Sequence, residues 1–329
     1  MSEYTIWWID DSPDRKENGA DRIEEHVEEL STEFNEPEDA IDRLDNGEDL
    51  AGIDLVLIDW KLNEDGGFFG KGLTMAGKVR EELTDIPVYG FSSDTVENKE
   101  EFEATYPFSD LHTKNGAEDL KADLEAYESV RSVRGEGLRD LIETLSPPED
   151  TIADLESAIP REYVNGLRPD PQSDGGSVVE FVDWVRTRFL DTPGPLWNDA
   201  WTATKIGLKE EILGDYAEDL NDTKHGKAIY EGIFSHRKSR LWWSSSVIDA
   251  VVTISQEKEI DFGELKTVGK NVLGESEVPN CRVCGEELPD ILAAGKNGED
   301  ATNPVHLGCS HIHHSREGPF EDYRVANDL

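Results

Sequence analysis

Polar residues suited to phosphate chemistry stand directly after several short apolar runs in the first 125 residues. Such runs are typical of buried strands, and the carboxyl ends of parallel strands form the edge of a sheet where ligands bind. Three carboxylates gathered there would repel one another without a hard cation, and Mg²⁺ prefers carboxylate, water and phosphate oxygens. A hydroxyl and a lysine beside them would contact a phosphoryl group. The five residues are Asp10, Asp11, Asp59, Ser92 and Lys114.

The elements that must position these residues are short strands alternating with amphipathic helical segments. This alternation predicts an α/β domain with an open, doubly wound, five-stranded parallel sheet. Turn signals such as Ser12-Pro13 and Glu36-Pro37 precede the helices. The expected helices are Asp14–Leu30, Ala40–Leu44, Leu73–Leu83 and one that opens near Gly116. The expected strands are Tyr4–Asp10, Ser31–Phe34, Leu55–Asp59, Val88–Phe91 and Asp110–Thr113.

This constellation of residues resembles the receiver domain of two-component response regulators. The resemblance covers about the first 125 residues and implies a flavodoxin-like fold for them. It implies that Asp59 is the phospho-acceptor and that Asp10 and Asp11 are the acidic pair that binds Mg²⁺. It also implies that the backbone carbonyl of Lys61 completes the metal shell. Ser92 would be the hydroxyl that contacts the phosphoryl group, and Lys114 would be its cationic partner.

Two positions depart from the receiver pattern. Asn115 follows the lysine, where receivers usually have proline, and Leu111 stands where the family commonly has an aromatic switch residue. The usual aromatic readout of phosphorylation is therefore in question, while the phosphorylation chemistry is retained. The alternative is a receiver fold kept as a scaffold for docking or dimerisation, without phosphotransfer.

A second cluster of candidate ligands lies near the C-terminus. Cys281 and Cys284 form a CxxCG knuckle, and His306 and Cys309 form HxxC. Three thiolates and one imidazole make a tetrahedral Zn²⁺ set, which a turn-rich segment needs in place of an apolar core. The histidines that follow could supply another fourth ligand or a catalytic metal site of HNH-nuclease type. They are His311, His313 and His314.

Between the two clusters, a helical region is expected, and its density of tryptophan is unusual. Residues 236–243 (HRKSRLWW) combine positive charge with aromatics, a combination that could bind single-stranded nucleic acid. The interpretation we favour is a helix with core tryptophans and cations paired to surface acids. The expected division is 1–125 receiver, 126–166 helical connector, 167–177 linker, 178–275 helical output domain and 276–329 zinc-knuckle-like segment.

Composition bounds the cellular setting. The chain has 73 acidic and 32 basic residues, a formal charge of −41, which is tolerable where salt is molar because screening shortens the range of repulsion. Such acidity looks like that of proteins from salt-accumulating halophiles. The beginning of the sequence lacks the pattern of a signal peptide, and no stretch resembles a transmembrane helix. A cytoplasmic protein without membrane association is expected.

These observations predict a response regulator that accepts a phosphoryl group on Asp59 and signals through a helical, zinc-binding output region. The expected partners are a sensor histidine kinase and an output partner, protein or nucleic acid, that the sequence does not identify. A homodimer is compatible with this reading. An output enzyme is not expected, because phosphate loops and nucleophile elbows are missing from the sequence. The rival is a receiver-gated, metal-dependent nuclease.

Overall fold

The computed structural model divides by its internal contacts into two compact units. The first unit comprises Met1–Glu136 with Leu167–Asp183, and the second comprises Gly137–Gly166 with Trp184–Leu329. The residues that the structure describes are 3–47, 50–62, 71–93, 102–170, 173–261, 263–288, 292–294 and 303–310.

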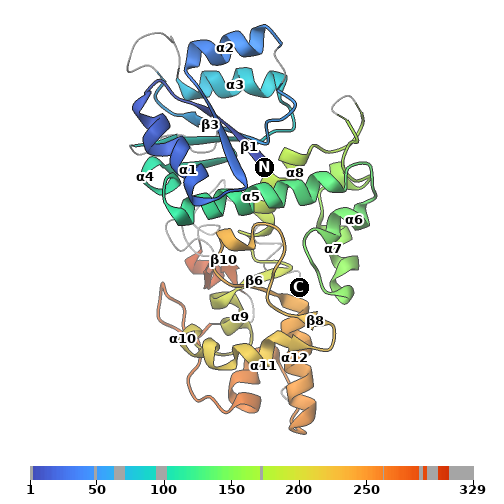
Figure 1. The fold of residues 1–329 in the computed structure, drawn as a ribbon. Coiled ribbons are helices and arrows are strands. Elements are labelled where there is room, and N and C mark those ends of the chain that lie inside the picture. Colours follow the sequence, from blue (N-terminus) through green and yellow to red (C-terminus); the bar gives the residue numbers. More distant parts are fainter. Residues whose placement is uncertain are drawn as a thin grey trace. The chain divides into compact units, whose positions relative to one another are not determined.

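A five-stranded parallel sheet forms the centre of the first unit (Figure 1). Its strand order, β2-β1-β3-β4-β5, is the order of flavodoxin-like doubly wound folds, as the sequence predicts. The strands pair in parallel throughout, so their carboxyl ends lie at one edge. Their bounds are β1 Tyr4–Ile9, β2 Leu30–Asn35, β3 Leu55–Asp59, β4 Val88–Ser92 and β5 Ala104–Pro107.

Helices cover both faces of this sheet (Figure 1). On one face, apolar side chains of α2 and α3 pack against Trp7, Val56 and Ile58 in one buried cluster. On the other, α1 contacts α5. These helices are α1 Asp21–His26, α2 Pro37–Asp45, α3 Gly72–Glu82, α4 Phe108–Leu111 and α5 Lys114–Ser132, and a π-helical turn, Lys16–Ala20, precedes α1.

The predicted fifth strand, Asp110–Thr113, is wrong. The fifth strand is Ala104–Pro107, and the chain then turns through α4 into α5. Thr113 caps α5, since its Oγ1 accepts a hydrogen bond from the amide of Gly116 at 3.0 Å and donates one to the carbonyl of Asp110 at 2.7 Å. A side chain at Gly116 would clash with that same carbonyl, so this tight junction depends on glycine.

A buried carboxylate connects α5 to the last two strands of the sheet. Asp123 is 1% exposed and accepts hydrogen bonds from the hydroxyls of Tyr89 and Tyr106, both at 3.0 Å. Tyr89 belongs to β4 and Tyr106 to β5. Because a buried carboxylate without partners is costly, these two donors stabilise the packing of α5 on the sheet.

Residues predicted as a linker are a packed part of the first unit. Arg168 and Arg134 both pair with the buried carboxylate of Asp85, at 3.2 and 3.1 Å. The amide of Gly135 donates to the carbonyl of Leu167 at 3.1 Å. The division by internal contacts groups 167–183 with the first unit, whereas the sequence analysis expects a 126–166 connector and a 167–177 linker. The contacts of Leu167 and Arg168 account for this grouping at the start of the stretch. Helix α8, Val178–Trp184, ends this stretch.

The second unit is mainly helical and contains three two-stranded sheets in its described part. Strands β6 and β9 pair antiparallel, and a helix follows each of them directly. Its α-helices are α6 Leu138–Glu143, α7 Ile152–Ala158, α9 Asp199–Lys205, α10 Glu210–Leu213, α11 Ala217–Asn221 and α12 Ser244–Glu257. Its strands are β6 Leu196–Asn198, β7 Asp222–Thr223, β8 Gly226–Lys227, β9 Leu241–Trp243, β10 Ala293–Ala294 and β11 Pro304–Val305. Short 3₁₀ turns lie at 149–151, 161–163, 214–216, 235–237, 265–267 and 307–309, and π-helical turns at 185–189 and 269–273.

One core joins the helical part of the second unit to the cysteine-containing segment. Trp201 and Trp242 lie in the same buried cluster as Cys281, Leu288 and Val305. Within the described part of the segment after residue 276, Cys281, Leu288, Leu292 and Val305 therefore belong to this shared core. None of the helices in the described part of the chain is long and apolar enough to cross a membrane.

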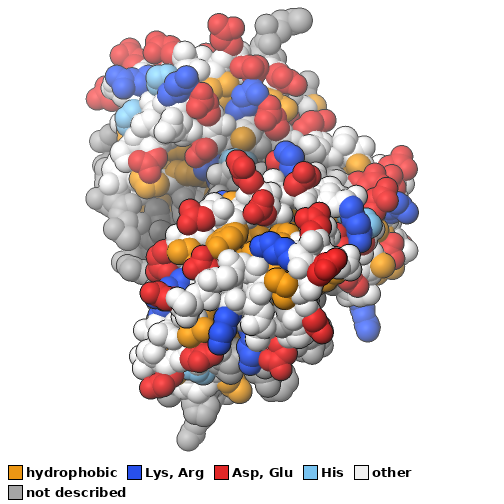
Figure 2. All heavy atoms as spheres, turned by 90° about the horizontal axis from the view of Figure 1, so that it is seen from below, with side chains coloured by type: hydrophobic (Ala, Val, Ile, Leu, Met, Phe, Trp, Pro, Cys, Tyr) orange, Lys and Arg blue, Asp and Glu red, His pale blue; other side chains and the backbone are white. Residues whose placement is uncertain are grey.

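Acidic side chains cover much of the face seen in Figure 2, with fewer lysines and arginines among them. Since repulsion among exposed carboxylates is relieved by screening, we expect stability to depend on salt. Raising KCl from about 0.1 M to molar concentration should raise the melting temperature by more than about 5 °C, equivalent to roughly 2 kcal/mol. Thermal melts followed by circular dichroism measure this. Equal melting temperatures in both buffers would remove the physical basis for a halophilic adaptation.

Candidate functional site

Three acidic side chains converge at the carboxyl edge of the sheet. Asp10 follows β1, Asp11 comes next, and Asp59 ends β3. One carboxylate oxygen from each lies within 4.8 Å of the others. Asp10 is 0% exposed and Asp59 2%, so two of the three carboxylates are almost removed from water. The structure thus brings together the three acids that the sequence predicts as metal ligands and phospho-acceptor.

Burial alters the protonation of this cluster. Desolvation, and next the charge of Asp59, raise the pKa of Asp10 to about 6. Desolvation also raises the pKa of Asp59, and the guanidinium of Arg15 opposes that rise. Oδ1 of Asp59 is buried without a hydrogen-bond partner among the described residues. A cation at this place would therefore stabilise the ionised carboxylates and satisfy that oxygen.

Arg15 supplies a positive charge that the sequence analysis missed. Its Nη1 lies 2.6 Å from Oδ2 of Asp59 and 3.4 Å from Oδ2 of Asp10. Its Nη2 donates to Oγ of Ser93 at 3.2 Å, and the guanidinium carbon lies 5.2 Å from the ring centre of Phe108. The Arg15 side chain is 19% exposed. It therefore neutralises part of the charge of the acidic cluster from within the chain.

Ser92 lies at the predicted edge of the sheet, but Lys114 does not lie at the acidic cluster. Ser92 ends β4, which pairs with β3 through Asp59 and Phe91, and it is 2% exposed. It therefore lies at the same edge of the sheet as Asp59. Lys114 is the first residue of α5, its side chain is 69% exposed, and its Nζ pairs with Glu118 at 3.4 Å. The structure does not show it at the acidic cluster, because the strand expected to present it is a helix instead.

The observed strands also show where Leu111 and Lys61 lie. Leu111 lies in α4 and is 1% exposed, so it is a core residue and does not belong to a strand. The aromatic residue of β5 is Tyr106. Lys61 follows β3 by two residues. The use of its backbone carbonyl for a metal ion stays a prediction.

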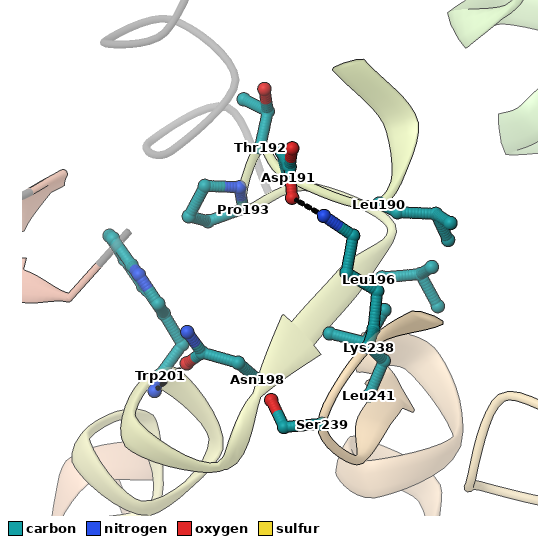
Figure 3. A pocket seen from close by; sticks show the side chains of 10 residues that line it. All are labelled: Leu190, Asp191, Thr192, Pro193, Leu196, Asn198, Trp201, Lys238, Ser239 and Leu241. Atoms are coloured by element: carbon teal, nitrogen blue, oxygen red, sulfur yellow. Dashed lines mark hydrogen bonds and ion pairs between the residues drawn. The ribbon is translucent and has the colours of Figure 1, made fainter. Parts of the chain in front are cut away.

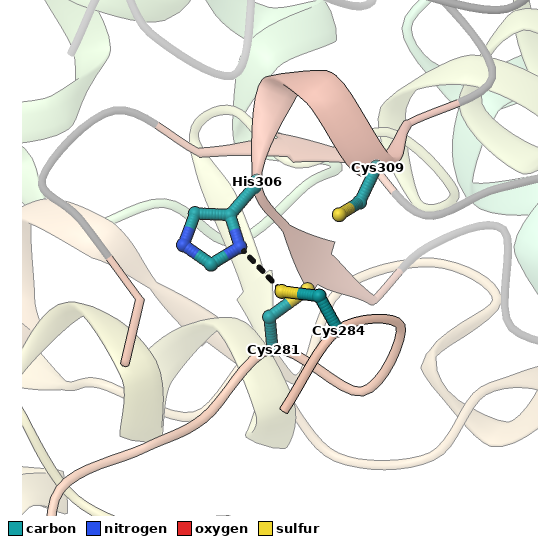
Figure 4. A group of neighbouring side chains, drawn as sticks. All are labelled: Cys281, Cys284, His306 and Cys309. Atoms are coloured by element: carbon teal, nitrogen blue, oxygen red, sulfur yellow. Dashed lines mark hydrogen bonds between the residues drawn. The ribbon is translucent and has the colours of Figure 1, made fainter. Parts of the chain in front are cut away.

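The four predicted zinc ligands converge in the second unit (Figure 4). One donor atom from each of Cys281, Cys284, His306 and Cys309 lies within 4.8 Å of the others. Nδ1 of His306 faces Sγ of Cys284 at 3.3 Å, while Nε2 lies 3.0 Å from the backbone carbonyl of Glu287. When Nε2 carries the proton and donates it to that carbonyl, the lone pair of Nδ1 is available to bind a metal ion. Metal-bound histidines are usually oriented in this way.

The knuckle itself explains why the sulfur of Cys281 can be a thiolate. The amide of Gly285 donates to the carbonyl of Cys281 at 2.8 Å, and Gly285 has a φ of 79°, which favours glycine. Burial alone would raise the pKa of Cys281, but hydrogen bonds from the backbone of His306 and two amides of the knuckle lower it to about 6. Desolvation and the neighbouring sulfurs raise the pKa of Cys309 to about 11. Three thiolates therefore coexist only around a cation, and the donor set fits Zn²⁺.

The three histidines that follow Cys309 in the sequence are predicted as alternative metal ligands. His311, His313 and His314 lie outside the described residues. The alternatives that depend on them, another fourth ligand or a catalytic metal site, stay predictions.

The helix expected for segment 236–243 is wrong, because Leu241–Trp243 forms strand β9 against β6 after a 3₁₀ turn at 235–237. The burial of its tryptophans and the pairing of its cations follow the favoured interpretation. Trp242 and Trp243 are buried in β9. Arg240 pairs with both carboxylate oxygens of Asp199 at 2.9 Å, and the guanidinium lies 4.8 Å from the ring centre of Trp242. Lys238 pairs with Asp191. These cations are already paired to acids, which weakens the case for phosphate contacts.

A pocket in the second unit lies beside this segment (Figure 3). Its volume is about 90 Å³, below the size of ordinary small-molecule sites. The ion pair between Lys238 and Asp191 lies on its wall. The pocket therefore gives little support for a bound metabolite.

Comparisons with known proteins concern only part of the chain. No family model matches, and no curated protein matches. The signal receiver domain of a DNA-binding response regulator from Colwellia psychrerythraea 34H is 15% identical, with 37% of this chain and 98% of that chain covered and a TM-score of 0.30. A response regulator from Thermotoga maritima is 19% identical, with 29% and 71% covered and a TM-score of 0.22. Likenesses this weak carry no conclusion about activity. The strand order and the flanking helices themselves define a flavodoxin-like fold.

Proposed function

We propose that the first unit is a phosphorylatable receiver in which Asp59 accepts the phosphoryl group. The observation that carries this proposal is the convergence of Asp10, Asp11 and Asp59, with donor atoms within 4.8 Å, at the carboxyl edge of a sheet with receiver topology. Ser92 ends the neighbouring strand, where its hydroxyl is suited to contact a phosphate oxygen. When bound, Mg²⁺ would neutralise charge that builds up on the transferring phosphoryl group.

In the transfer step, a carboxylate oxygen of Asp59 attacks the phosphorus of the donor. The new bond joins that oxygen to phosphorus, and the bond from phosphorus to the donor's leaving oxygen or nitrogen breaks with its electron pair. The donor would be a phosphohistidine of a sensor kinase or a small acyl phosphate. The unpartnered oxygen and the burial of Asp59 support this role, because the carboxylate is held at the edge of the sheet without a saturating set of hydrogen bonds.

The test is labelling with acetyl phosphate in the presence of Mg²⁺, measured by intact mass. The wild type should gain the mass of one phosphoryl group, and Asp59→Asn should gain none. Asp14→Asn is the matched control, since Asp14 is an exposed aspartate of the same unit outside the cluster. A wild-type mass that stays unshifted, or equal labelling of Asp59→Asn, would contradict the proposal and favour a scaffold with a receiver fold.

For the second unit we propose a structural zinc site and a partner-binding output. The four ligands described above complete a tetrahedral set, which leaves no coordination position open for an activated water. A closed site supports a structural role more than the rival nuclease. A sensor histidine kinase, a protein or nucleic-acid output partner and a salt-rich cytoplasm remain part of the proposal.

A further inference from the structure

The positive charge beside the carboxylate of Asp59 is the guanidinium of Arg15. Arg15 contacts Asp59 at 2.6 Å and Asp10 at 3.4 Å, and Ser93 holds the other end of the guanidinium at 3.2 Å. These partners come from three different strand ends, β1, β3 and β4. The planar guanidinium can reach all of them at once because its N–H groups diverge in a fixed fork.

This arrangement conflicts with a metal ion at the same carboxylates. Nη1 contacts Oδ2 of both Asp10 and Asp59, and Oδ1 of Asp59 has no hydrogen-bond partner among the described residues. A divalent cation on that oxygen would share the Asp59 carboxylate with the guanidinium. The two cations would repel strongly in so buried a place, so each weakens the binding of the other.

We propose that Arg15 is a built-in competitor of the divalent metal ion, which must swing away from Asp10 and Asp59 before the metal can bind. The inference rests on the proposed function in that it assigns a divalent metal to this cluster. It adds a threshold in Mg²⁺ concentration, because the metal ion has to displace the guanidinium of Arg15 before the acceptor site is complete. The side chain has a route outward, since it is 19% exposed and its contact with Ser93 is at the surface.

The experiment measures Mg²⁺ affinity of the unphosphorylated full chain by isothermal titration calorimetry. Arg15→Gln should bind Mg²⁺ about tenfold more tightly than the wild type, since a hydrogen-bonded charge no longer competes. Ser93→Ala should show a smaller gain of about threefold, because it loosens only one end of the guanidinium. Arg22→Gln is the matched control, an exposed arginine on α1, and should bind as the wild type does.

Folding of the Arg15→Gln variant is followed by thermal melts with and without Mg²⁺. A melting temperature that falls without the metal and recovers with it supports the competition, because either cation then satisfies the same carboxylates. Equal Mg²⁺ affinity in the wild type, Arg15→Gln and Ser93→Ala would overturn the proposal. Should Arg15→Gln fail to fold even with Mg²⁺, an unchanged affinity of Ser93→Ala would overturn it, and a raised affinity would support it.

Labelling by acetyl phosphate separates this inference from the proposed function. A raised Mg²⁺ affinity of Arg15→Gln in a protein that is never labelled supports the competition and contradicts phosphotransfer. Labelling of the wild type with equal metal affinities contradicts the competition and leaves the phospho-acceptor role of Asp59 intact.

Discussion

Replacing His306 with alanine is expected to release the zinc ion and to unfold the cysteine-containing part of the second unit. Nδ1 of His306 faces the sulfur of Cys284, and Cys281 belongs to the same core as Trp201 and Trp242. Structural zinc contributes about 10 kcal/mol or more to the folding of small zinc domains, so its loss should be felt throughout this shared core. Zinc content by elemental analysis and the melting temperature measure the two effects.

His225→Ala is the matched control for this experiment. His225 is an exposed histidine of the same unit that is not among the metal-ligand candidates, so the variant should keep one equivalent of zinc. A double substitution of His313 and His314 by alanine should also keep it. Zinc that stays in His306→Ala but leaves the double variant would show that another histidine is the fourth ligand. Metal-dependent nuclease activity lost in the double variant, with zinc unchanged, would establish the nuclease.

The second large effect is expected at Trp242. Its side chain is 0% exposed, and its Nε1 donates to Oδ1 of Asp199 at 2.7 Å. Trp242→Ala should lower the free energy of unfolding by about 3–5 kcal/mol, because it leaves a large cavity in the second core. Urea unfolding monitored by circular dichroism measures the change.

Trp242→Phe divides this cost into packing and hydrogen bonding. The variant keeps an aromatic ring but lacks the donor, so Asp199 loses this hydrogen bond and keeps its ion pair with Arg240. A loss of about 1–3 kcal/mol is expected. A change in the free energy of unfolding below about 0.5 kcal/mol in the alanine variant would mean that Trp242 does not stabilise the core in solution.

Much of the first unit is predictable because its signals are local. Buried strands such as Leu55–Asp59 are continuous apolar runs that end in a polar residue, and their alternation with helices predicts a parallel sheet. The predicted zinc ligands are equally local within each pair, since CxxC and HxxC each place two donors in one short turn. For these features, neighbouring residues determine the geometry.

The sequence predictions fail where contacts between distant residues determine the structure. Asp110–Thr113 stands before a lysine, as a fifth strand would in a receiver, but Thr113 caps a helix and Ala104–Pro107 pairs with β4. Arg15 carries no signal in the sequence, because a single arginine in a polar turn is ordinary. Its partner Asp59 is 44 residues away along the chain, and only folding brings them together.

The arginines that hold Asp85 have a consequence for the covalent order of the chain. The first unit is closed by residues on both sides of 137–166, which belong to the second unit. No single cut in the polypeptide therefore separates the two units. A fragment that stops at residue 125 or 136 lacks Arg168, and one that continues to 183 carries a piece of the other unit with its apolar side chains unpartnered. The two units are interleaved along the chain, so the first unit cannot complete its contacts until the 137–166 segment of the second unit and then 167–183 have been synthesised.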